Sequence, residues 1–221
     1  MGIRQLLENN RNWSAAAVAK DPQFFSRLSA QQAPSCLWIG CADSRVPANE
    51  IVGLLPGELF VHRNLANVVV HTDLNCLSVI EFAVDLLHVK DIIVCGHYGC
   101  SGVQAALARS RIGLSDNWLR HVQDVYDKHE HGMVGLQDVA RRHDRLCELN
   151  VLEQVMNVCG TTVLQDAWAR GDAIEVHGLI YSLKDGRLRD LGMAVSSPDE
   201  ARGRYEEALS RLDKTATAAR S

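Results

Sequence analysis

The sequence has no apolar run long enough to cross a membrane and no excess of basic residues. A transmembrane helix needs about 20 consecutive apolar residues, and no segment of this 221-residue chain approaches that length. Lys and Arg number 23 against 27 Asp and Glu, which gives a formal net charge of −4. A mildly acidic chain offers no basic surface for the phosphates of a nucleic acid. We therefore expect neither a membrane protein nor a nucleic-acid-binding protein.

The first residues, MGIRQLLENNRNWS, lack the apolar stretch of a secretory signal peptide. We therefore expect a cytoplasmic protein. In a reducing compartment its seven cysteines should be free thiols that pack, bind metal or catalyse, because disulfides persist under oxidising conditions.

Short apolar segments at 36–40, 58–62 and 91–96 predict buried β-strands. The segment 72–89 between the last two has helical apolar spacing, with Thr72 or Asp73 as its N-cap. Strands joined by helical crossovers indicate an α/β fold, with a mostly parallel central sheet flanked by helices. Asp185-Gly186 is a strong turn signal between apolar segments, so a C-terminal hairpin should extend the sheet.

Helical patterns at 3–19 and 23–32, separated by Asp21-Pro22, predict an N-terminal helical arm. We find no repeat, linker or low-complexity block, so we expect a single domain over 1–221. Its parts are the arm (1–34), an α/β core (35–197) and a C-terminal helix with a tail (198–221). The apolar stripes of the arm have no partner in the predicted sheet, which predicts at least a dimer.

Two of the seven cysteines, Cys41 and Cys100, lie where a predicted strand gives way to a helix. Cys41-Ala42-Asp43-Ser44-Arg45 follows the first strand, and His97-Tyr98-Gly99-Cys100 follows the third. Ligands of open α/β sheets bind outside the carboxyl ends of the strands, so the two segments should meet. The remaining five fall at apolar positions and are predicted to be small buried hydrophobes: Cys36, Cys76, Cys95, Cys147 and Cys159.

Two thiolates, an imidazole and a carboxylate at one sheet edge favour zinc. If Asp43 binds the metal the site is closed, and if Asp43 turns away a water can take the fourth position. The guanidinium of Arg45 can hold Asp43 bidentately and keep it off the metal. One alternative is a non-catalytic zinc-stabilised module, against which Arg45 argues. Another is a thiol redox protein, which the absence of a Cys-x-x-Cys pair disfavours.

The segment CADSRVPANEIVGLLPGELFVHRNLAN, followed by HTDLNCLSVIEFAVD and GHYGCSGVQAAL, resembles the β-class carbonic anhydrases. The resemblance implies reversible hydration of carbon dioxide, with zinc on Cys41, His97 and Cys100, Asp43 as a conditional fourth ligand, and Arg45 as the partner of Asp43. In the three-histidine carbonic anhydrases, zinc lowers the pKa of a bound water to about 7. A same-fold hydrolase of carbon disulfide or carbonyl sulfide is the alternative.

The same resemblance implies two further groups of residues and a homodimer or homotetramer. The first group forms an apolar substrate pocket, partly across a subunit interface: Gln32, Phe60, Leu65 and Phe82. The second group forms a regulatory bicarbonate pocket beside the loop 44–50, as in the bicarbonate-regulated members: Trp38, Arg63 and Tyr181. The alternative for this second group is core packing, with Arg63 paired to a carboxylate such as Glu50. None of the nine histidines stands out as a proton shuttle.

Overall fold

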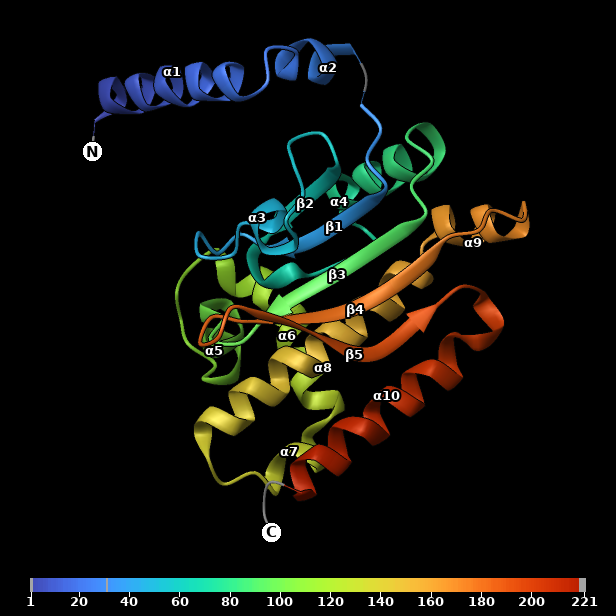
Figure 1. Ribbon diagram of the computed structural model, residues 1–221. Helices are drawn as coiled ribbons and strands as arrows, with labels where there is room; N and C mark the ends of the chain where they lie inside the picture. The colour runs from blue at the N-terminus through green and yellow to red at the C-terminus, as the bar shows by residue number, and fades with distance from the viewer. Residues whose placement is uncertain (1, 31, 219–221) are drawn as a thin grey trace.

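A five-stranded sheet forms the centre of the computed structural model, which describes residues 2–30 and 32–218, with side chains up to 214 (Figure 1). The strand order is β2-β1-β3-β4-β5. The first four strands run parallel and β5 is antiparallel to β4. The predicted sheet and its C-terminal hairpin are therefore confirmed. The strands are β1 (Cys36–Cys41), β2 (Leu59–Asn64), β3 (Asp91–His97), β4 (Glu175–Ser182) and β5 (Arg187–Val195).

Helices fill most of the remaining chain. Two form the N-terminal arm, α1 (Ile3–Lys20) and α2 (Phe24–Ala30), separated at Asp21-Pro22 as predicted. The others are α3 (Ala48–Val52), α4 (Leu74–Glu81), α5 (Ser101–Leu107), α6 (Ser115–Lys128), α7 (Glu130–Val134), α8 (Val139–Cys159), α9 (Thr162–Ala169) and α10 (Pro198–Ala218).

The crossover between β2 and β3 begins as predicted but does not continue as a regular helix. Asp73 is the N-cap of α4, because its carboxylate accepts a hydrogen bond from the Asn75 N–H. After Glu81 the chain forms one π-helical turn, Phe82–Leu86, closed by the Leu87 N–H on the Phe82 carbonyl. The wider turn inserts an extra residue, which a 3.6-residue period does not reveal.

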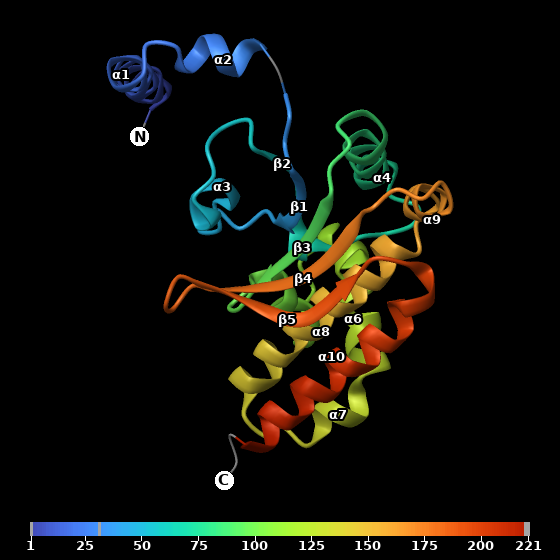
Figure 2. The same ribbon diagram turned by 45° about the vertical axis from the view of Figure 1, so that its right-hand side comes forward.

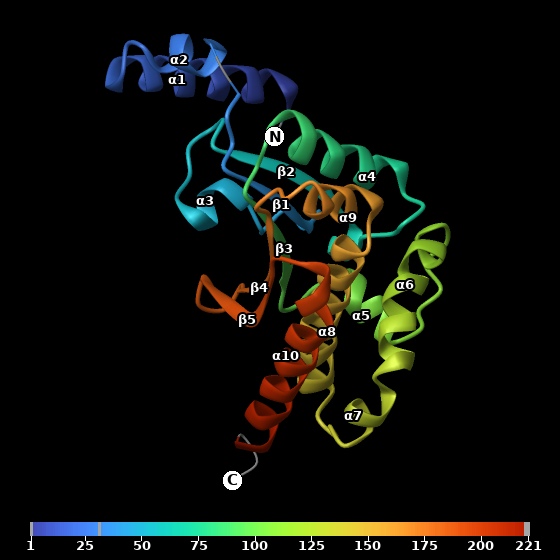
Figure 3. The ribbon, with the colours of Figure 1, turned by 90° about the vertical axis from the view of Figure 1, so that its right-hand side faces the viewer.

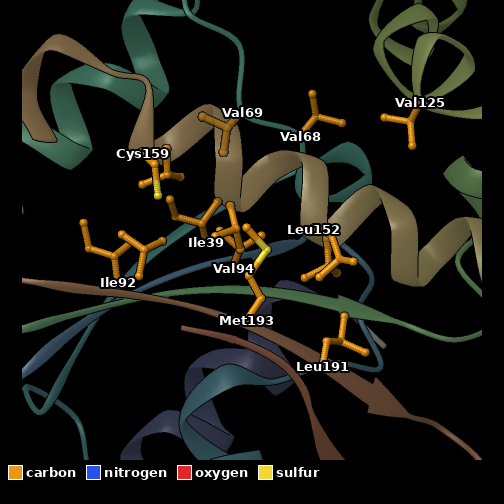
Figure 4. Packing of buried hydrophobic residues seen from close by; sticks show 14 of the residues in the cluster. Ile39, Val68, Val69, Ile92, Val94, Val125, Leu152, Cys159, Leu191 and Met193 are labelled. Carbon is orange, nitrogen blue, oxygen red and sulfur yellow. The ribbon is translucent and has the colours of Figure 1, made fainter. Parts of the chain in front are cut away.

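The two faces of the sheet are covered unequally (Figure 3). On one face α8 packs against β3, β4 and β5, and α10 packs against β5. Figure 4 shows Ile39, Val94 and Met193 of the strands together with Leu152 of α8 in this core. On the other face a smaller cluster around Trp38 is covered by α3 and the chain after it. Side chains of β4 on that face are only partly buried. Of the five strands, only β1 is buried at every position.

The N-terminal arm projects from the rest of the chain (Figures 1 and 2). No residue of α1 is buried, although Leu6, Leu7 and Trp13 are apolar. The ring of Trp13 packs edge-on against Phe25 of α2, 5.7 Å between centroids. The arm therefore presents apolar surface to solvent in a single chain. Among the helices of residues 2–30 and 32–218, none has the length and apolar character that a membrane span requires.

The five cysteines predicted to be core residues are all buried: Cys36, Cys76, Cys95, Cys147 and Cys159. Burial raises the pKa of the Cys76 and Cys159 thiols to about 12. Such thiols stay protonated at neutral pH and act as small apolar side chains.

Candidate metal centre

The structure brings Cys41, His97 and Cys100 together at the carboxyl edge of the sheet. Cys41 ends β1, His97 ends the neighbouring strand β3, and Cys100 precedes α5. One donor atom of each lies within 4.8 Å of the other two. All three side chains are buried. The strand order therefore produces the convergence that the two sequence segments predict.

The three donors have the geometry and chemistry that fit zinc. The two sulfurs lie 3.8 Å apart, and two sulfurs each about 2.3 Å from a tetrahedral zinc are separated by about 3.8 Å. The His97 ring binds the Tyr98 carbonyl through Nδ1, at 3.1 Å. Its Nε2 is buried without a hydrogen-bond partner among the described residues. A histidine whose Nδ1–H is held by a carbonyl presents an unprotonated Nε2, as metal ligands do.

The local electrostatics favour a negative charge on Cys41. Its pKa is lowered chiefly by the hydrogen bond with Cys100, and then by His97 and the backbone N–H groups of Asp43 and Ala66, against the opposing effect of burial. The same interaction raises the pKa of Cys100, and burial adds to that increase. Negative charge is therefore favoured at one of the two sulfurs, and such a charge attracts a cation such as zinc.

Asp43 is turned toward Arg45. Its carboxylate accepts hydrogen bonds from Arg45 Nε at 2.9 Å, Nη2 at 2.6 Å and the backbone N–H at 2.9 Å. The hydrogen bond from the guanidinium holds the pKa of Asp43 well below its usual range. Asp43 Oδ2 nevertheless lies 3.8 Å from His97 Nε2. The structure thus shows the arrangement with three donors and an adjacent ionised carboxylate.

The second set of predicted residues lies on the sheet face opposite α8. Arg63 donates from Nε to the Cys41 carbonyl at 2.9 Å and from Nη2 to the Asp43 carbonyl at 2.5 Å. Arg63 of β2 is paired with Gly40 of β1. The Trp38 indole lies over Gly40, because a Cβ built on Gly40 would be 2.4 Å from the indole nitrogen. Tyr181 packs against the same cluster as Trp38. Arg63 therefore holds the backbone of the metal centre.

Of the four predicted pocket residues, the structure places only Leu65 at the metal centre of the same chain. Leu65 follows β2 and lies 3.3 Å from a Cβ built on Gly102. Phe60 and Phe82 stack on each other with centroids 5.8 Å apart. However, Phe60 is in register with Leu37, at the far end of β1 from Cys41. Gln32 precedes β1 and is exposed, so these three residues can reach a metal centre only in another subunit.

Sequence reasoning missed the residues that hold the turn 65–69 beside Cys41. Trp118 of α6 donates to the Leu65 carbonyl, and Asn150 of α8 donates to the Ala66 carbonyl. The available signal is the spacing of Asn150, Gln154 and Asn157, because three amides at i, i+4 and i+7 share one helix face. The first two of these amides are buried.

Two other groups of metal-ligating side chains differ from this centre. In the first, Asp73 caps α4, and His62 Nε2 lies 3.2 Å from the Asn64 amide nitrogen, beside the protonated Cys76. The second is a half-buried ion-pair cluster on β3 and β4, made of Asp91, Glu175 and His177. Of these three groups, only that of Cys41, His97 and Cys100 has a buried nitrogen or oxygen without a hydrogen-bond partner among the described residues.

Comparison with known proteins gives one consistent family. The family model described as carbonic anhydrase matches residues 36–188. A carbonic anhydrase of Emericella nidulans is 50% identical over 189 residues, 86% of this chain and 83% of that protein. The Coccomyxa β-carbonic anhydrase in complex with acetazolamide has a TM-score of 0.86 and 40% identity, with 90% of each chain covered. A tetrameric β-carbonic anhydrase of Sordaria macrospora has a TM-score of 0.82 and 39% identity, covering 87% of this chain and 98% of that one.

Proposed function

Because the chain belongs to the carbonic anhydrase family, in its β class, we propose that it is a zinc enzyme that hydrates carbon dioxide reversibly to bicarbonate and a proton. The observation that carries the zinc assignment is the buried group of Cys41, His97 and Cys100 with its unpartnered His97 Nε2. Asp43 is hydrogen-bonded to Arg45, so the fourth position of a tetrahedral zinc would be open to an exchangeable ligand.

The residues around the centre have separable roles. Cys41, His97 and Cys100 would hold zinc, which would lower the pKa of a bound water, as it does to about 7 in the three-histidine enzymes. Asp43 stays ionised and fixed by Arg45, so it accepts a hydrogen bond from the attacking water and orients a lone pair toward the carbon atom. Leu65 offers an apolar wall for an apolar substrate. The carboxylate therefore contributes orientation and the guanidinium fixes the carboxylate.

A substrate comparison tests the proposed reaction. Zinc-loaded protein is mixed in a stopped-flow instrument with carbon dioxide, carbonyl sulfide or carbon disulfide, and proton release and sulfide are followed. Carbon dioxide should be converted far faster than either sulfur compound. Sulfide release without measurable carbon dioxide hydration would instead support the same-fold hydrolase and overturn the proposal.

We also propose that the active unit is at least a homodimer. Two observations support a second copy of the chain. The apolar surface of α1 is exposed, and Gln32, Phe60 and Phe82 lie away from the metal centre of their own chain. Burial of apolar surface is the main driving force for such association. In this assembly the arm and the Phe60–Phe82 stack of one subunit complete the substrate pocket of another.

Removal of residues 1–20 should weaken this association by at least about tenfold, since burial of one large apolar side chain contributes about 1.5–3 kcal/mol. Sedimentation velocity over a range of micromolar concentrations measures the change. The variant Glu8→Gln, on the same exposed helix, should sediment as the full chain does. A full chain present only as a 24.4 kDa species would contradict the proposal.

We further propose that bicarbonate regulates the enzyme through Trp38, Arg63 and Tyr181. Arg63 supplies a cationic fork, and the indole N–H and phenol O–H can donate to an anion. Arg63 holds the carbonyls of Cys41 and Asp43, so an anion that binds its guanidinium competes with those carbonyls. Release of the Asp43 carbonyl would let the loop 44–50 shift and bring the carboxylate onto the metal. Bicarbonate would thereby favour the closed site.

The regulated enzyme should show a sigmoidal response to bicarbonate, with a Hill coefficient above 1. The substitution Arg63→Ala should make that response hyperbolic while one zinc per chain is retained, because the three metal donors are unchanged. Initial-rate measurements between pH 7 and 9, with zinc content determined on the same samples, test this. The variant Arg170→Ala, a surface arginine paired with Asp85, serves as the control. Wild-type kinetics that are hyperbolic throughout this range would refute the regulatory proposal.

A further inference from the structure

The turn 65–69, which follows β2, has an unusual backbone. Ala66 has φ 64° and Asn67 has φ 48°, so two consecutive non-glycine residues are left-handed. Such residues cost conformational free energy and persist only where the surrounding structure holds them. The turn must therefore be held by contacts from outside its own sequence.

Those contacts come from an amide ladder on α8, made of Asn150, Gln154 and Asn157. Asn150 Nδ2 donates to the Ala66 carbonyl at 2.9 Å, and Gln154 Oε1 accepts from the Val69 N–H at 2.8 Å. Asn157 Nδ2 donates to the Val69 carbonyl at 3.0 Å. The ladder is also bonded internally, Gln154 to Asn150 and Asn157 to Gln154, each at 3.0 Å.

A second element holds the start of the turn. The indole N–H of Trp118 on α6 donates to the Leu65 carbonyl at 2.8 Å. Asn150 and Gln154 are 0% and 1% exposed, so water cannot replace their hydrogen bonds. Amides suit this role because each can donate and accept at once. Asn64 at the end of β2 also donates to the Val68 carbonyl and accepts from the Val68 N–H. The two helices and Asn64 thus determine where the backbone of the turn lies.

The turn faces the metal centre. Ala66 packs in the same buried cluster as Cys41 and Cys100, with its backbone N–H beside the Cys41 sulfur. A Cβ built on Gly102 would be 3.3 Å from both Leu65 and Ala66, so the turn also packs against the first turn of α5, next to Cys100. A shift of the turn therefore changes the hydrogen bonding of one metal-ligating sulfur directly.

We propose that Trp118, Asn150, Gln154 and Asn157 are positioning residues, which hold the turn 65–69 so that the Ala66 N–H stays on the Cys41 sulfur. This inference rests on the proposed function, in which Cys41 binds zinc. A hydrogen bond to a thiolate withdraws electron density from it, and a weaker donor leaves the metal a stronger Lewis acid. The two helices therefore tune the acidity of the metal centre although none of their four side chains is a ligand.

The test compares two matched tryptophan variants. Trp118→Phe removes the N–H on Leu65 and keeps an aromatic ring. Trp168→Phe removes an equivalent N–H, on the Ile174 carbonyl at 2.9 Å, remote from the turn. In cobalt-substituted protein the sulfur-to-cobalt charge-transfer band of Trp118→Phe should move to lower energy, because the Cys41 sulfur becomes a stronger donor. The midpoint of its pH–rate profile should move to higher pH, with up to about a tenfold loss of rate at pH 7.

The control Trp168→Phe should match the wild type in both measurements. If Trp118→Phe fails to bind cobalt, Asn157→Ala becomes the test variant. Its control is Gln165→Ala, because Gln165 makes a comparable hydrogen bond to the Cys159 carbonyl. An unshifted band in the turn variants, or an equal shift in the controls, would overturn the inference. The cobalt spectrum reports on Cys41 even if carbon dioxide is not the substrate, so failure of the proposed function remains distinguishable.

Discussion

Replacing His97 with Ala should abolish both zinc retention and carbon dioxide hydration, with a loss of rate of at least about a thousandfold. Loss of an outer-shell partner of a metal costs about 10- to 100-fold, and His97 would be a direct ligand. Its ring supplies the only nitrogen among the three clustered donors. Two sulfurs alone leave a tetrahedral zinc without the third protein ligand that a catalytic site requires.

Metal analysis of the purified protein, before and after dialysis against a chelator, measures the first effect. A stopped-flow hydration assay measures the second. Wild type should hold one zinc per chain, and Cys41→Ser should behave as His97→Ala does. The matched control is His177→Ala, which removes a histidine from the ion-pair cluster on β3 and β4 and should retain zinc. Full zinc content in His97→Ala or Cys41→Ser would refute the ligand assignment.

The sheet and the group of residues at the candidate metal centre could be predicted because their signals are local. Continuous apolar runs mark β1 and β3, and the Asp185-Gly186 turn marks the hairpin of β4 and β5. Cys41 and His97 each end a strand, so the general rule about strand ends was enough to bring them together. The direction of Asp43 was left open between metal and Arg45, because two rotamers of one side chain are equally compatible with the sequence.

The turn 65–69 could not be predicted from its own residues. Left-handed Ala66 and Asn67 have no glycine signal. The hydrogen bonds of Asn150 to Ala66 and of Gln154 to Val69 join residues 84 and 85 positions apart along the chain. Such contacts depend on the tertiary placement of α8. The uneven coverage of the sheet was missed for a similar reason, since Leu179 and Tyr181 of β4 are apolar on that face whether a helix or a second subunit covers them.

Arg45→Ala should keep one zinc per chain and yet lower the hydration rate at pH 7 by about a hundredfold. In the structure the guanidinium makes two hydrogen bonds to Asp43, and a carboxylate held in this bidentate way is fixed in position. Without this partner the pKa of Asp43 returns toward its usual range, which still leaves the carboxylate ionised at neutral pH. The Asp43 carboxylate therefore keeps its negative charge in the variant, but it no longer has the Arg45 guanidinium to bind.

The freed Asp43 carboxylate starts 3.8 Å from His97 Nε2, so it can become the fourth protein ligand and close the site. Hydroxide competes better than water for that position, so activity of the variant should recover in part as pH rises from 7 to 9. The variant Arg45→Lys keeps the charge without the planar fork and should be intermediate. Arg109→Ala, which breaks an exposed ion pair with Asp127, should match the wild type. Zinc content and pH–rate profiles of the four proteins decide the matter, and an Arg45→Ala enzyme with the wild-type rate and profile would show that Asp43 is not a switchable ligand.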